Sequence, residues 1–140
     1  QKMAILSFKA SANISPSRFV TLSGENTVAQ AGDNADIIGV AQEGSNKAPL
    51  QDFVSTVYAA ETGQPIAVYS TGELCLVEAG GSFSAGTLLK SDSQGQAVAV
   101  ATTGTTIQNY GAVALQAATA AGQKILCLVL PLQKVRPALS

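Results

Sequence analysis

Short apolar segments alternate with polar, turn-forming segments along the whole chain. Runs of about four to seven residues rich in Val, Ile, Leu and Ala are separated by Gly, Ser, Asn, Asp and Gln at roughly ten-residue spacing. This pattern is typical of an all-β barrel or sandwich. It predicts strands at residues 19–22, 27–29, 37–41, 65–69, 73–78, 87–90, 97–101, 110–117 and 124–130.

The order of these segments occurs twice. In each copy an apolar run is followed by a Gly-containing strand and then by a Gly-Gln pair: Phe19–Leu22, Ile38–Ala41 and Gly63-Gln64 in the first, and Thr87–Lys90, Gly111–Ala114 and Gly122-Gln123 in the second. We therefore predict one β domain over residues 13–131, built from two similar strand-turn units at about 13–69 and 82–130. A repeated string of strands favours an architectural unit over a scaffold for one set of catalytic groups.

Residues 44–62 have no counterpart of that length in the second copy, and we interpret them as an insertion. Leu50, Phe53, Val57 and Tyr58 share one face of a helix at their spacing, whereas residues 53–58 also have strong β propensity. The sequence thus leaves open a short helix near residues 50–60 or a further strand. Because the insertion is partly apolar, we expect it to pack on its own barrel or on a neighbouring subunit.

Both ends of the chain lie outside the two predicted units. Apolar residues nearly alternate over residues 1–10, which is typical of an extended arm or of a first strand. We assign residues 1–12 to an N-terminal arm. Residues 132–140, which contain Pro137, are expected to form an extended C-terminal tail.

The composition is poor in charge. Charged residues make up 12% of the 140 residues and the formal net charge is -1, with Lys and Arg scattered singly. Neither a nucleic acid nor an anionic membrane is therefore an expected partner. A low surface charge has two explanations: other chains cover part of the surface, or Ser, Thr, Gln and Asn supply its polarity.

The sequence lacks the usual catalytic groups. It contains no His, which removes the commonest general base and the Ser-His and Cys-His nucleophile pairs. We expect no catalytic, cofactor-binding or metal-binding residue, and we do not expect an enzyme. The two cysteines occupy similar Leu-Cys-Leu-Val contexts and are expected to be buried reduced thiols, with a disulfide as the alternative.

The repeated segments resemble the small capsid decoration, or cement, proteins of tailed bacteriophages. The resemblance rests on the order of Phe19–Leu22, Ile38–Ala41, Leu74–Gly80 with Ser84–Leu89, and Gly111–Leu115 with Gly122-Gln123. It implies a β-barrel or β-tulip-like subunit, usually trimeric, that binds the outside of a mature head and holds neighbouring major capsid subunits together. The expected partners are the major capsid protein and further copies of the chain, and the expected location is the capsid exterior of a virion assembled in the host cytoplasm. The alternative is a head-fibre or receptor-binding virion module.

We hypothesise that the parts that do not repeat carry the contacts with the capsid or with other subunits. The N-terminal arm would pair as an added strand with another chain. The candidate contact residues are Met3, Ile5, Leu6 and Phe8 in the arm, Leu50, Phe53, Val57 and Tyr58 in the insertion, and Arg136 in the tail.

Overall fold

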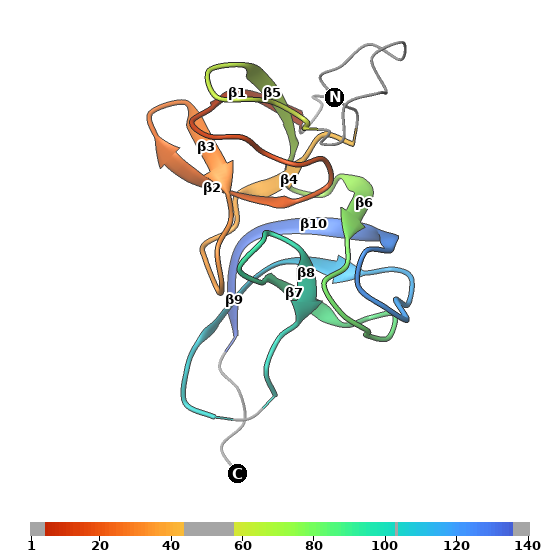
Figure 1. Cartoon of the computed structure of the whole chain (residues 1–140). Coiled ribbons are helices and arrows are strands. Elements are labelled where there is room, and N and C mark those ends of the chain that lie inside the picture. Colours follow the sequence, from red (N-terminus) through yellow and green to blue (C-terminus); the bar gives the residue numbers. More distant parts are fainter. Residues whose placement is uncertain (1–4, 44–57, 103, 136–140) are drawn as a thin grey trace.

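The computed structural model describes residues 5–43, 58–102 and 104–135. These residues form ten strands and contain no helix (Figure 1). The expected all-β fold is confirmed. The strands are β1 (Ile5–Ala10), β2 (Phe19–Gly24), β3 (Thr27–Gln30), β4 (Gly39–Ala41), β5 (Pro65–Tyr69), β6 (Leu74–Glu78), β7 (Leu88–Ser91), β8 (Ala97–Ala99), β9 (Gln108–Ala114) and β10 (Lys124–Val135).

The strands separate into two units that follow each other along the chain. The first unit is a closed barrel in the order β1-β3-β2-β4-β5, coloured red to yellow-green in Figure 1. The second unit is a five-stranded sheet in the order β6-β10-β9-β7-β8, coloured green to blue.

The two units share one pairing scheme. Antiparallel pairs β1–β5, β2–β3, β2–β4 and β4–β5 correspond to β6–β10, β7–β8, β7–β9 and β9–β10. The parallel pairing of β1 with β3 has its counterpart in a parallel bridge between Ala79 and Ala97. The structure therefore contains the same five-stranded unit twice.

The N-terminal strand corrects the arm that we expected. β1 pairs with β5 along Ile5–Lys9 and with β3 through Lys9 and Ala10, so residues 5–10 close the first barrel. The alternating apolar pattern therefore marks a first strand, because without β1 the edges of β3 and β5 would lack partners. At the other end, residues 132–135 belong to β10 and not to an extended tail.

The proposed insertion is partly described. Residues 44–57 lie outside the described residues, and with them most of the segment that we weighed as a short helix. Ala60 is buried and bridges Ile14, and the second unit has the same bridge between Phe83 and Ala118. Ala60 thus belongs to the repeated framework.

Two apolar cores hold the molecule together. The first fills the barrel with buried side chains that include Ile14, Val20, Val28, Ile66 and Val68. The second joins both units: it contains Phe19, Ile37 and Val40 of the first unit together with Val77, Leu89, Cys127 and Val129 of the second. Because adjacent residues of a strand point to opposite faces, Phe19 serves the shared core while Val20 serves the barrel core.

Candidate functional site

The junction between the units is built from backbone. In the first unit, the Lys9 amide donates to the Asn26 carbonyl at 3.0 Å. At the corresponding place in the second unit, the Glu78 amide donates to Ser17 O and the Phe19 amide donates to Gly95 O, each at 2.8 Å. Residues 17–19 of the first unit therefore lie between β6 and the turn before β8, and they connect these two parts of the second unit.

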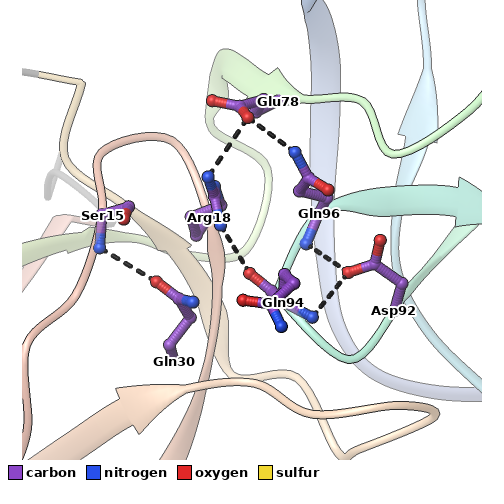
Figure 2. A network of polar contacts seen from close by, with 7 residues as sticks. All are labelled: Ser15, Arg18, Gln30, Glu78, Asp92, Gln94 and Gln96. Carbon is purple, nitrogen blue, oxygen red and sulfur yellow. Dashed lines mark hydrogen bonds and ion pairs between the residues drawn. The ribbon is translucent and has the colours of Figure 1, made fainter. Parts of the chain in front are cut away.

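Side chains reinforce this junction around Arg18 (Figure 2). Arg18 Nη1 donates to Gln94 O at 2.7 Å, and Arg18 Nη2 lies 3.2 Å from Glu78 Oε2. The same Glu78 oxygen accepts a hydrogen bond from Gln96 Nε2 at 2.6 Å. Only 16% of the Arg18 side chain and 20% of the Glu78 side chain are exposed, so this ion pair is better shielded than an ordinary surface pair.

The turn that receives Arg18 is shaped by Asp92. Its Oδ1 accepts hydrogen bonds from the Gln94 and Gln96 amides at 2.8 and 2.9 Å. Gly95 at the tip has a φ of 76°, a left-handed conformation that glycine adopts without strain. A Cβ at Gly95 would lie only 2.8 Å from Gln30 Cγ, so the position also requires a small residue. This arrangement explains the polar cluster as a structural connection between the units.

A second polar connection involves the loop at residues 33–36. Asn34 Oδ1 accepts from the Asn109 amide at 2.9 Å, and Asn109 Nδ2 donates to Asn34 O at 2.8 Å. Lys134 Nζ lies 3.1 Å from Asp36 Oδ1, but both side chains are about 60% exposed, so this pair contributes little to stability. The loop therefore uses its polar residues to fix the first unit on β9.

The two cysteines face each other across β6 and β10. Cys75 and Cys127 are register partners, both thiols are free and buried, and their Sγ atoms are 3.9 Å apart. The hydrogen bond with Cys127 and the burial of the thiol raise the pKa of Cys75 far above its ordinary value. The protonated thiol is therefore the form that the folded protein favours.

We expect both thiols to resist labelling in the native protein at pH 7.5, because the nucleophile that attacks a thiol reagent is an exposed thiolate and both thiols are buried. A thiol-reactive chromophore should modify two cysteines within seconds in concentrated guanidinium and should require global or local opening in buffer. The raised pKa of Cys75 contributes stability that is complete below about pH 8.5, the pKa of an unfolded cysteine, and is lost as the pH rises above it. Immediate labelling of the native protein at pH 7.5 would contradict the burial of the two thiols.

The outer face of the second unit is apolar. Leu74, Leu128, Val113 and Leu88 are consecutive register partners across β6, β10, β9 and β7. A second row pairs Leu76 with Leu126, whose carbonyl accepts a hydrogen bond from the Leu115 amide. These residues alternate with the buried core residues and so point away from the core. We call this surface the leucine face: Leu74, Leu76, Leu88, Val113, Leu115, Leu126 and Leu128.

Two members of the leucine face are strongly exposed, although leucine is usually buried. The exposed fraction is 56% for Leu74 and 43% for Leu115, while the other members are half-buried. Contiguous apolar surface of this kind marks an interaction site in soluble proteins. We therefore take the leucine face as the candidate functional site.

The predicted contact residues are only partly described. Met3, Leu50, Phe53, Val57 and Arg136 lie outside the described residues. Ile5 and Leu6 lie in β1, and Tyr58 is half-buried. Phe8 packs against the first core, which places it in the barrel.

The sequence does contain a signal for the leucine face that our prediction missed. Leu74–Val77 and Leu126–Val129 are apolar at four consecutive positions, where a strand with one solvated face alternates with polar residues. Uninterrupted apolar strands are typical of a sheet that is covered on both faces.

Within residues 5–43, 58–102 and 104–135, no pocket and no cluster of three or more metal-ligating side chains is found. The same residues include no helix that is long and apolar enough to cross a membrane.

Comparison with known proteins gives a structural relative. No protein-family model and no curated protein matches the sequence. Among solved structures, the crystal structure of the head fiber gp8.5 N base in bacteriophage phi29 matches with a TM-score of 0.53 and 17% sequence identity. The match covers 94% of this chain and 99% of that chain. The chain therefore shares its fold with the base of a phage head fibre.

Proposed function

We propose that this chain is a structural protein of a bacteriophage virion that attaches to the outer surface of the head. The observation that carries the proposal is the structural match to a head-fibre base, which extends over nearly the whole of both chains. The resemblance of the repeated segments to capsid decoration proteins supports the same location.

As a decoration protein, the chain acts as a trimer that binds the major capsid protein and stabilises contacts between its subunits. Three equivalent contacts on one trimer raise the effective affinity, so each contact can be individually weak. The formal net charge of -1 implies that attachment depends only mildly on salt.

A second candidate is the base of a head fibre. This candidate is favoured because the solved structure that matches this chain is the base of a head fibre. Both candidates bind the outside of the head. They differ in their effect on capsid stability. A decoration protein stabilises the shell, whereas a fibre base binds to its surface without stabilising it.

Cosedimentation with mature heads that lack this protein tests the proposal. We expect the chain, at about 10 µM, to pellet with the heads in a saturable manner, and we expect binding to change little between 50 and 300 mM salt. Heads of an unrelated phage are the control. Absence of pelleting with the cognate heads would contradict attachment, and a decorated head that disrupts at the same temperature as a bare one would favour the fibre base.

A further inference from the structure

The pair of thiols in the second unit can be compared with the same position of the first unit. Cys127 and Val68 are each the fourth residue of their strand, and their register partners are Cys75 and Leu6. Val68 is fully buried in the barrel core, so an ordinary apolar side chain fills in the first unit the place that Cys127 fills in the second. The sequence contains two cysteines, and both occupy this one position. What two thiols add to apolar packing is the capacity to form a covalent bond with each other.

The backbone places the two cysteines within the range of a disulfide. One ladder repeat further along the strands, the Val129 amide donates to Glu73 O at 3.0 Å. Hydrogen-bonded pairs recur at every second position of an antiparallel ladder. Cys75 and Cys127 therefore form such a pair, with Cα atoms about 5.5 Å apart. Disulfides span Cα separations of about 4.4–6.8 Å, so the two strands already have the spacing that the bond requires.

The sulfur atoms are also close. The Sγ atoms of Cys75 and Cys127 are 3.9 Å apart, and a disulfide bond is about 2.05 Å long, so the two atoms need to approach by about 2 Å. Rotation about the Cα–Cβ bonds moves the sulfur atoms while the backbone stays in place. Both side chains belong to the core shared by the two units, and the chain contains no other thiol that could compete for either of them.

We propose that Cys75 and Cys127 form a reversible disulfide that fastens β6 to β10, with a small-molecule disulfide such as oxidised glutathione as the oxidant. First, the thiolate of one cysteine attacks a sulfur of the oxidant, which forms a mixed disulfide and releases one glutathione. The thiolate of the other cysteine then attacks the protein sulfur of the mixed disulfide and releases the second glutathione. The two cysteines lose two electrons and two protons, which the oxidant takes up as it becomes two glutathione thiols.

The bond acts on the strand that joins the two units. β6 is an edge strand of the second sheet. Its Glu78 amide donates to Ser17 O at 2.8 Å, and its Leu76 amide donates to Glu43 Oε2 at 2.7 Å, and both acceptors belong to the first unit. A covalent link from β6 to β10 therefore also secures the strand that carries these contacts. The pair stays as thiols in a reducing compartment and forms the bond in an oxidising one.

Burial determines how fast the bond forms. Both thiols are buried, and the hydrogen bond with Cys127 and the burial of the thiol raise the pKa of Cys75, so the folded protein presents little reactive thiolate. Oxidation therefore requires β6 to separate from β10. Because β6 is an edge strand, this opening breaks its ladder with one neighbouring strand, and it is a local event.

Incubation of the reduced protein with oxidised glutathione at about pH 8.5 tests the bond. The solution contains urea below the unfolding transition, at a concentration at which a thiol-reactive chromophore labels both cysteines within the incubation time. We expect mass spectrometry to show the loss of two hydrogen atoms and a thiol assay in guanidinium to find no free thiol. The bond closes a loop that spans 52 residues, so the unfolding equilibrium constant measured with urea should fall about a hundredfold or more. Dithiothreitol should restore the value of the reduced protein.

Cys127→Val is the matched control, because valine is the residue at the corresponding position of the first unit, Val68. This variant should gain at most one glutathione per chain, and its stability should not rise with the oxidant. Should Cys127→Val fail to fold, Cys127→Ser provides the same comparison.

Three results would overturn the proposal. The first is that the wild type keeps both free thiols or only carries glutathione adducts after the incubation. The second is that the chains become linked to each other in place of forming an intramolecular bond. The third is an intramolecular bond that leaves the urea midpoint unchanged or lowers it, because the native pairing of β6 with β10 would then not accept the bond.

Discussion

Gly39→Val is expected to lower the free energy of unfolding by about 3 kcal/mol or more, because overpacking against backbone cannot be relieved by a side-chain rotation. A Cβ at Gly39 would overlap the Tyr69 carbonyl oxygen and Val68 Cγ1. Gly39 lies at the start of β4, where the strand enters the closed barrel between β2 and β5. Urea unfolding followed by far-ultraviolet circular dichroism would measure the change.

The control for this prediction is Gly81→Ala. Nothing lies within 4 Å of a Cβ at Gly81, and its φ is outside the left-handed region. We expect its stability to stay within about 0.5 kcal/mol of the wild type, as for other surface substitutions. Equal, small effects of both substitutions would show that β4 and β5 do not approach as closely as the structure places them.

The repeat and most of its strands were predictable because their signals are local. Apolar runs such as Phe19–Leu22 and Lys124–Leu130 are bounded by turn residues, and the turn residues recur at matching places in both copies. Gly39 also carries a local signal, because a glycine within a strand indicates a bulge or a close approach of backbones. The structure shows a close approach, between Gly39 and the Tyr69 carbonyl.

The pairing of the first strand and the contact of residues 17–19 with the second unit depend on partners that are distant in the sequence. The pattern of residues 1–10 fits an arm as well as a strand, and only the pairing of β1 with β5 decides between them. Similarly, the insertion of residues 17–19 beside Glu78 follows from the packing of one unit on the other, for which Ser17 and Arg18 carry no local signal.

The candidate site was missed for a related reason. Both faces of β6 and β10 are apolar in the sequence, but one face belongs to the shared core and the other is the leucine face. Which face is which depends on the register between strands, because a shift of one residue exchanges them. The sequence therefore shows that two apolar faces exist without showing which of them remains open.

Phe19→Ala tests whether a residue of the first unit forms part of the core of the second unit. Phe19 is completely buried and is the largest fully buried side chain among the described residues. Its truncation should lower the free energy of unfolding by about 3–5 kcal/mol, as for other buried aromatic residues.

The strands in which amide hydrogen exchange accelerates should distinguish a core shared by the two units from two independent cores. In Phe19→Ala, hydrogen exchange should accelerate most at amides that the first unit holds in the second, above all Glu78, whose amide donates to Ser17 O. Ile14→Ala is the matched control, because Ile14 is equally buried but belongs to the barrel core, so its effect should centre on β1–β5. If both variants accelerate exchange in the same strands to the same extent, the second unit does not depend on residues 17–19 to hold β6 beside the turn before β8.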